Sequence, residues 1–289
     1  MTNQLHHKLS VLIKTFDRKS SLIKLLQSLE KFHPGLPILI ADDSRESYRG
    51  EIISRFPKLL IQYYTLPFDT GLAAGRNFLL HKTTTPYFLL CDDDFVVDHR
   101  LNLEKTLAAI ETAQLDIGGG TLLNYTTAKT IRRFARVMLT PSMASRFILN
   151  KPTEVYYTGN YQVDNNHCTL SISWRKPSTS IYHCDIVCNF FIGRSAAILN
   201  MQGWNDQFKV GEHEDFFYRA KQYQLKVAWL DDFAIAHYPV APASYLPFRQ
   251  RVLTFKQQFV EQSGLDSFRE IDGNTGETAF FFHPAKIAQ

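Results

Sequence analysis

The sequence of 289 residues lacks several features that mark particular classes of protein. Its four cysteines are too few and too scattered for a disulfide framework. No apolar run is long enough to cross a membrane, and no apolar signal-peptide core follows Met1, so we expect a cytoplasmic protein. No internal repeat is visible, which argues against a solenoid.

Glycine-rich phosphate-binding loops are also missing, since neither G-x-x-x-x-G-K-(S/T) nor a strand-following G-x-G-x-x-G occurs. A diphosphate ligand would therefore need a metal ion rather than a cradle of backbone N–H groups. Basic residues outnumber acidic ones only slightly, 32 against 28, and they are scattered. We therefore expect no nucleic-acid partner, whereas an anionic substrate or peripheral contact with the inner face of the cytoplasmic membrane suits the mild basic excess.

The most informative segment is an apolar run at residues 87–91 that ends in Asp92, Asp93 and Asp94. A buried strand that ends in adjacent carboxylates needs a cation, because unpaired acids at that position repel each other and lose hydration. Oxygen ligands favour Mg²⁺ or Mn²⁺, with a phosphate on the far side of the ion. The alternative is an acidic turn that is capped by N–H groups or paired with Arg100.

Strand and helix patterns alternate along the first half of the chain. Apolar strand patterns occupy residues 9–13, 38–41 and 59–66, and helical periodicity occupies residues 22–32, 71–83 and 103–110. This βαβα order predicts an α/β fold of the Rossmann-like kind, with a mainly parallel sheet and helices on both faces.

The second half has a different pattern. Alternating polar and apolar residues at 154–163 and 169–174 predict a small antiparallel addition. An amphipathic pattern at roughly residues 248–262, followed by a glycine-rich end, predicts a C-terminal helical extension.

Polar residues that follow the first strands are candidates for nucleotide binding. The carboxyl ends of parallel strands meet at one edge of the sheet, so Thr15, Asp42 and Asp43 are expected beside the acidic triplet. An aspartate there can accept hydrogen bonds from a uracil or a ribose. Arg18 and Arg76 can bind diphosphate oxygens, or they can simply neutralise neighbouring acids.

An acid-rich helix start in the second half carries Glu212, Glu214 and Asp215. One such carboxylate is enough to take the proton of an attacking hydroxyl, whereas the alternative is that these acids only complement the helix dipole. His237 ends a later strand and is either a metal ligand or a structural histidine. We predict that Trp204 stacks on a sugar face.

Seven short sequence blocks, taken together and in their order along the chain, are informative about its family. They are residues 14–18 (KTFDR), 41–44 (ADDS), 66–68 (LPF), 74–77 (AGRN), 92–95 (DDDF), Asp185 with 189–191 (NFF), and His213 with 216–217 (FF). In combination they resemble the inverting family-two glycosyltransferases of the GT-A fold. The resemblance is closest to the β-1,4-N-acetylgalactosaminyltransferases of ganglioside-type glycan synthesis, and it covers roughly residues 9–237.

This resemblance implies a GT-A fold, a UDP-sugar donor and inversion at the anomeric carbon. It implies an Mn²⁺ or Mg²⁺ ion at the triplet, with Asp94 at the metal-binding end, and we add Asp92 and His237 as candidate ligands. Asp215 falls where the family has its candidate catalytic carboxylate, and Glu214 is the second candidate.

The same resemblance places Thr15, Asp42 and Arg76 in a nucleotide pocket. Asn189 with Cys188 is expected to hold an N-acetyl group, through a polar partner and a small apolar wall. We divide the chain into a glycosyltransferase domain at residues 1–240, with a nucleotide-binding half (1–123) and an acceptor and catalytic half (124–240), and an extension at 241–289.

We therefore expect a metal-dependent transferase that moves N-acetylgalactosamine from UDP to a glycan hydroxyl. The acceptor is expected to be a bacterial surface polysaccharide or lipopolysaccharide glycan, with a lipid-linked form included, and galactose, glucose or N-acetylglucosamine stays open as the donor sugar. A sugar nucleotidyltransferase needs a glycine-rich N-terminal loop, which residues 14–16 do not form. A non-catalytic glycan-binding protein would have no need for the carboxylates.

Overall fold

The computed structural model describes residues 5–125, 152–240 and 246–282. Its main sheet consists of β1 (Leu9–Thr15), β2 (Pro37–Asp42), β3 (Leu60–Thr65), β4 (Tyr87–Asp92), β5 (Phe95–Val96), β6 (Ile117–Asn124), β7 (Thr153–Val155), β10 (Ile181–His183), β12 (Phe191–Arg194) and β13 (Val227–His237). The strand order is β10-β13-β6-β12-β4-β1-β2-β3, with β5 beside β13 and β7 beside β6.

The first half of the chain forms the parallel part of this sheet. β4, β1, β2 and β3 lie side by side and all run in parallel, as the βαβα order predicted. β12 reverses the direction, because it pairs antiparallel with both β4 and β6, whereas β13 is parallel to β6. The carboxyl ends of β1, β2 and β4 therefore lie at one edge, where open α/β sheets bind ligands.

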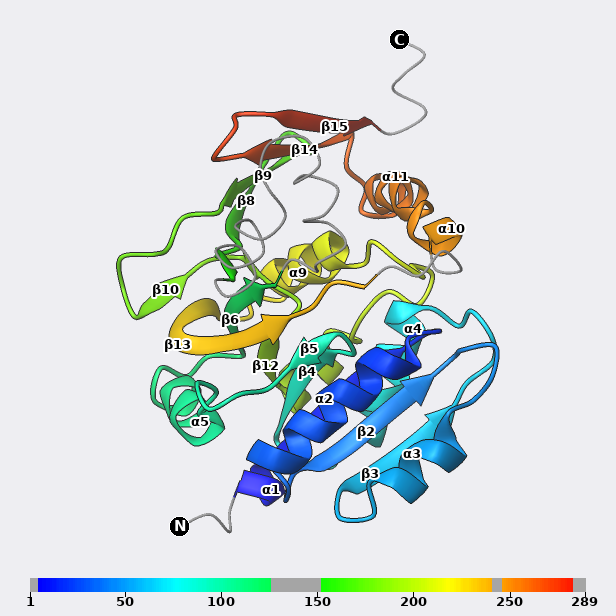
Figure 1. Ribbon diagram of the computed structural model, residues 1–289. Helices are drawn as coiled ribbons and strands as arrows, with labels where there is room; N and C mark the ends of the chain where they lie inside the picture. Colours follow the sequence, from blue (N-terminus) through cyan, green and yellow to red (C-terminus); the bar gives the residue numbers. More distant parts are fainter. Residues whose placement is uncertain (1–4, 126–151, 241–245, 283–289) are drawn as a thin grey trace, which may run out of the picture.

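Helices cover both faces of the main sheet (Figure 1). The helices of the described residues are α1 (Leu5–Lys8), α2 (Lys19–Phe32), α3 (Arg49–Arg55), α4 (Leu72–Lys82), α5 (Leu103–Thr112), α8 (Ser195–Asn200), α9 (His213–Gln222), α10 (Leu246–Arg249) and α11 (Val252–Gln262), of which α10 and α11 lie beside the second sheet. Val11 and Ile13 of β1 join the apolar cluster of α2 and α5, whereas Leu12 joins that of α4 and α9. Because successive side chains of a strand point to opposite faces of the sheet, β1 contributes to an apolar core on each face. In the described part of the chain, no helix has the length and apolarity needed to cross a bilayer.

A second sheet lies above the first in Figure 1. It contains β8 (Thr158–Asp164), β9 (His167–Ser173), β11 (Ile186–Val187), β14 (Ser267–Asp272) and β15 (Thr278–Phe282), in the order β11-β8-β9-β14-β15. β8, β9 and β11 form the predicted antiparallel addition. The segment at 154–163, which we treated as one alternating stretch, is divided between β7 of the main sheet and β8 of the second.

The C-terminal extension is only partly helical. After α10 and α11 the chain forms the β14–β15 hairpin, and β14 pairs in parallel with β9. The amphipathic pattern predicted a helix followed by a glycine-rich end, and these two strands were not predicted. The extension therefore completes the second sheet.

Candidate active site

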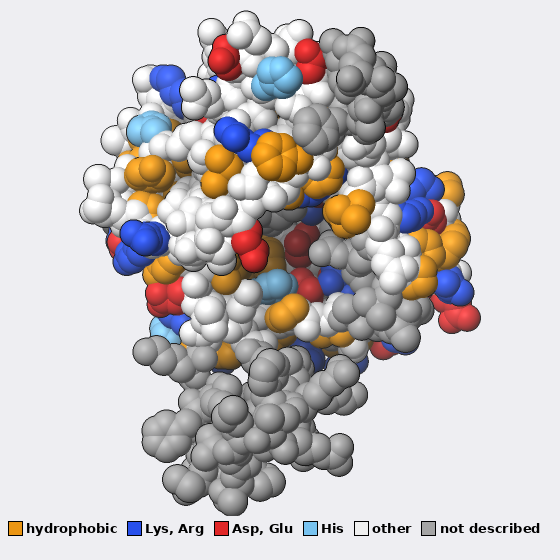
Figure 2. All heavy atoms as spheres, turned by 90° about the horizontal axis from the view of Figure 1, so that it is seen from above, with side chains coloured by type: hydrophobic (Ala, Val, Ile, Leu, Met, Phe, Trp, Pro, Cys, Tyr) orange, Lys and Arg blue, Asp and Glu red, His pale blue; other side chains and the backbone are white. Residues whose placement is uncertain are grey.

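A cavity of about 510 Å³ opens at the carboxyl edge of the parallel strands. Its wall combines Asp92 and Asp94 after β4 with Arg18 after β1, and with Glu212 and Glu214 at the start of α9. The space-filling view shows a hollow whose visible walls include acidic, basic and histidine side chains (Figure 2). Residues from both halves of the chain thus meet around one space.

Two arginines neutralise the acidic triplet in this structure. Arg18 contacts Asp93 at 2.5 Å and Asp94 at 2.7 Å, and Arg76 contacts Asp92 at 3.1 Å. Arg100, the partner that the sequence offered as an alternative, pairs with Asp98 instead. The cations come from helix starts that are distant in sequence, and their side chains are almost entirely buried.

Burial and charge together give the three carboxyl groups different proton affinities. Burial raises the pKa of Asp93 to about 7, although Arg18 opposes the shift. Burial also raises the pKa of Asp92 against the effect of Arg76. The pKa of Asp94 is lowered, because hydrogen bonding to His237 and the charge of Arg18 outweigh its burial.

Candidate metal ligands line the same cavity. The Nε2 atom of His237 lies 3.5 Å from Oδ1 of Asp94, and its Nδ1 lies 2.6 Å from Oδ1 of Asn124, which fixes the orientation of the ring. Across residues 5–125, 152–240 and 246–282, no three His, Cys, Asp or Glu side chains converge as a ready-made metal centre. Two carboxylates and an imidazole around one cavity are nevertheless a donor set that suits Mn²⁺ or Mg²⁺.

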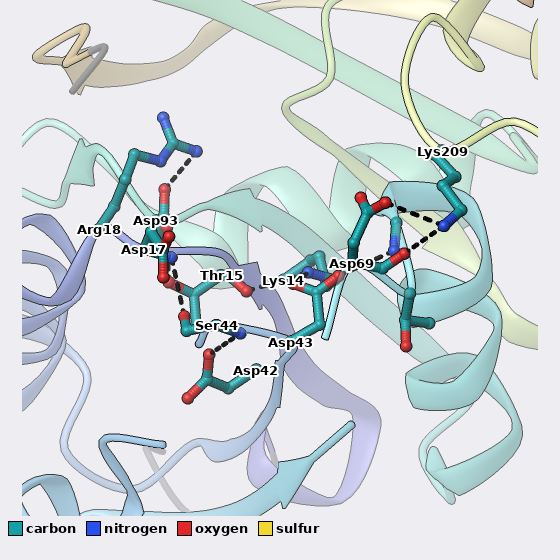
Figure 3. Close-up of polar contacts among 12 residues, drawn as sticks. Lys14, Thr15, Asp17, Arg18, Asp42, Asp43, Ser44, Asp69, Asp93 and Lys209 are labelled. Carbon is teal, nitrogen blue, oxygen red and sulfur yellow. Dashed lines mark hydrogen bonds and ion pairs between the residues drawn. The ribbon is translucent and has the colours of Figure 1, made fainter. Parts of the chain in front are cut away.

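The ends of β1 and β2 are held by a buried polar network (Figure 3). Lys14 forms an ion pair with Asp43, and Asp43 also accepts a hydrogen bond from the backbone N–H of Gly71 at 2.8 Å. Asp42 is fully buried and accepts a hydrogen bond from the Tyr63 hydroxyl at 2.6 Å, so it shapes the end of β2 rather than lining the cavity. We did not assign a role to Lys14 from the sequence.

A narrow space of about 30 Å³ lies next to this network. Thr15, whose hydroxyl donates to Asp93 at 2.6 Å, contributes to its wall. The C-terminal extension forms the other wall through Phe248, whose ring centroid lies 4.9 Å from that of Phe16. The predicted nucleotide-binding residues therefore lie beneath part of the extension.

The acids of α9 point in different directions. Glu212 is buried in an ion pair with Arg76. Asp215, our first candidate for the base, does not line the cavity, and it is held by Arg219 at 2.9 Å. Burial raises the pKa of Asp215, and Arg219 opposes that effect. Glu214 lines the cavity, and the structure therefore favours it over Asp215 as the group that can reach a substrate.

Asn189 and His213 form a neutral pair in the cavity wall. Nδ1 of His213 lies 2.7 Å from Oδ1 of Asn189, and burial lowers the pKa of His213 to about 4. Cys188, beside Asn189, is buried. Trp204, which we predicted to stack on a sugar, is instead a core residue, since it is 2% exposed and its ring stacks on Phe216 at 4.6 Å.

Solved structures with the same architecture are GT-A glycosyltransferases. The crystal structure of S. aureus TarS 1-349 has a TM-score of 0.53 and 17% identity, covering 88% of this chain and 70% of that one. A structure of GalNAc-T7 with UDP, GalNAc and Mn²⁺ has a TM-score of 0.57 and 15% identity, covering 91% of this chain and 51% of that one. At such low identity the likeness shows the fold alone, and it confirms the GT-A class.

The sequence profile described as Glycosyl transferase family 2 matches residues 10–178, and the chain belongs to this family. Beta-1,4 N-acetylgalactosaminyltransferase 2 of Mus musculus is 35% identical over 123 residues, which are 43% of this chain and 23% of that protein. Beta-1,4 N-acetylgalactosaminyltransferase 1 of Homo sapiens is 36% identical over 111 residues, 38% of this chain and 20% of that protein. Each alignment thus spans about a fifth of the length of these relatives.

Proposed function

We propose that the chain transfers N-acetylgalactosamine, with inversion, from UDP to a hydroxyl of a glycan. The observation that carries this proposal is one cavity that brings Asp92 and Asp94 of the triplet, Arg18 and Arg76 together with the carboxylate of Glu214. A nucleoside diphosphate needs the cations, and an attacking hydroxyl needs the base.

Each group then has a defined task in the transfer. The acceptor oxygen attacks the anomeric carbon while the bond from that carbon to the diphosphate breaks, and UDP leaves with the electron pair. Glu214 takes the proton of the attacking hydroxyl. Arg18 and Arg76, each held between carboxylates, are oriented to meet the charge on UDP.

A divalent cation completes the proposal for UDP binding. Asp92, Asp94 and His237 would hold Mn²⁺ or Mg²⁺, which when bound neutralises charge on the departing diphosphate. GalNAc-T7, a structural neighbour, was solved with UDP and Mn²⁺, which supports this assignment for a shared fold.

The donor sugar is assigned from the relatives and from one residue of the cavity. The similar proteins named above are N-acetylgalactosaminyltransferases. Asn189 lines the cavity and offers an amide that can pair with an N-acetyl group. For the acceptor we propose a glycan of a bacterial surface polysaccharide or lipopolysaccharide, lipid-linked and reached at the inner membrane face by peripheral association.

UDP release from matched concentrations of four donors tests this function. UDP-N-acetylgalactosamine should release UDP fastest, and UDP-galactose should be slower by about tenfold to a few hundredfold, because the partner of the acetamido group is left unpaired. UDP-N-acetylglucosamine and UDP-glucose complete the panel, and EDTA should abolish release. Pyrophosphate release from UTP would instead identify a nucleotidyltransferase, and binding of glycans without any release would identify a lectin-like protein.

A further inference from the structure

The C-terminal extension contributes a charged group to the cavity beside Glu214. Lys256 of α11 lies with its Nζ 3.2 Å from Oε1 of Glu214 and 2.6 Å from Oε1 of Glu270 on β14. All three side chains are largely buried, with 13–16% of each exposed. One ammonium group therefore bridges two carboxylates, of which only Glu214 faces the cavity described above.

Apart from Lys256 and Glu270, the described ionisable groups that face Glu214 are uncharged at neutral pH. The ionisable groups that face it in the described part of the chain are Lys256, Glu270, and the phenols of Tyr157 and Tyr161. Burial holds the pKa of both tyrosines well above the usual value, so these rings are neutral. The Tyr161 hydroxyl donates to the backbone carbonyl of Glu214 at 2.9 Å and does not engage its carboxylate. His213, next in sequence, is uncharged near neutral pH because burial lowers its pKa to about 4.

Lys256 and Glu270 act on Glu214 in opposite directions. The ammonium group attracts the Glu214 carboxylate, whereas the charge of Glu270 repels it and also competes for the same cation. Lys256 itself stays charged, because the two carboxylates outweigh its burial and raise its pKa. Burial and the charge of Glu214 raise the pKa of Glu270, although Lys256 opposes the shift.

We propose that Lys256 and Glu270 are positioning residues that set the orientation of the Glu214 carboxylate during transfer. This inference rests on the proposed function, and it adds residues that lie outside the segment matching the family profile, which ends at residue 178. In this chain the extension would thereby be part of the catalytic apparatus, because α11 carries the cation that holds Glu214 and β14 carries the acid that competes for that cation.

The charges predict the sign of each effect on turnover. Lys256→Met should lower kcat by roughly tenfold with little change in KM for the donor, since it removes the cation that holds Glu214 and leaves Glu270 to repel it. Glu270→Gln should leave kcat within about threefold of the original, since Lys256 is then left to Glu214 alone.

The experiment measures kcat and KM for UDP release by the full chain and four variants. Lys256→Arg keeps a cation and should restore most of the lost kcat. Lys221→Met is the matched control, because Lys221 pairs with Asp185 at 2.6 Å about two turns further along α9 and does not line the cavity. Thermal unfolding of each variant confirms that it is folded.

A lower kcat in Lys256→Met that Lys256→Arg restores, with Lys221→Met unchanged, would support the proposal. An unchanged kcat in Lys256→Met, or an equal loss in Lys256→Met and Lys256→Arg, would overturn it and leave a packing role for the residue. If Lys256→Met does not fold, Lys256→Gln takes its place in the same comparison. Failure of the proposed function looks different, because the unmodified chain would then release no UDP from any donor.

Discussion

Glu214 and Asp215 are adjacent on α9 but have opposite surroundings. Glu214 lines the cavity, whereas Asp215 is held by Arg219 one turn along the helix. We expect Glu214→Gln to lower kcat by roughly a hundredfold or more with little change in donor affinity, because the proton then has no acceptor. Asp215→Asn should leave kcat within a few-fold of the original and cost about 1–3 kcal/mol of stability. A dead Asp215→Asn beside an active Glu214→Gln would return the role of the base to Asp215.

The sequence predicted the chemistry of this site better than the direction of each side chain. The acidic triplet, Arg18 and Arg76 could be named because acids and cations follow successive parallel strands. The choice between Glu214 and Asp215 could not be made, because consecutive residues of a helix point about 100° apart and their directions depend on packing. Phe216, which stacks on Trp204 in the core, sets that rotation. The same packing explains why Trp204 is unavailable to a sugar.

At the scale of elements, the loop after β3 anchors the C-terminal extension. Asp69 in this loop contacts Arg251, which precedes α11, at 2.8 Å, and Lys209 at 3.0 Å. The two cations outweigh burial and lower the pKa of Asp69 from its usual 3.8. A depressed carboxyl pKa contributes stability above the unfolded value, and this stability is lost as the pH falls through the folded value.

We therefore expect Asp69→Asn to weaken the docking of α11 at pH 7, and this effect to shrink as the pH falls through the lowered pKa of Asp69, where the original carboxylate is itself protonated. Hydrogen exchange of the α11 amides at pH 7 and across the acid range measures this. Asp98→Asn is the matched control, because Asp98 pairs with Arg100 in another loop. Equal exchange in the original chain and Asp69→Asn at pH 7 would show that the ion pairs do not hold the extension.

Local patterns explain which elements were predictable. Residues 38–41 form a continuous apolar run and residues 9–13 are apolar except for Ser10, as strands buried on both faces should be. The β14–β15 hairpin was missed, since its strands alternate weakly and β14 pairs with β9, about 100 residues earlier in the chain. Such long-range pairing leaves no local pattern in a single sequence. The boundary that we placed at residue 240 stays a prediction.

At the scale of the whole molecule, aromatic contacts join the extension to α9. Phe268 of β14 packs against Phe259 of α11 with ring centroids 5.1 Å apart, and Phe259 packs against Tyr218 of α9 at 5.5 Å. Phe268 and Phe259 belong to the same apolar cluster as Trp204 and Phe216. A shared core of this kind should unfold together with the rest of the chain.

Phe268→Ala should therefore destabilise the entire molecule by about 3–5 kcal/mol, because it leaves a cavity in a core that spans both sheets. Phe280→Ala is the matched control, since Phe280 lies in the same hairpin and is 53% exposed, and it should cost less than about 1 kcal/mol. Urea unfolding is followed by tryptophan fluorescence and by far-ultraviolet circular dichroism, and both probes should report one shared midpoint that Phe268→Ala lowers. Two separate transitions, with only the first moved by Phe268→Ala, would instead show that the extension folds as an independent unit. Residues 246–282 would then be an accessory to the catalytic core, and Lys256 would lose the rigid support that its proposed role requires.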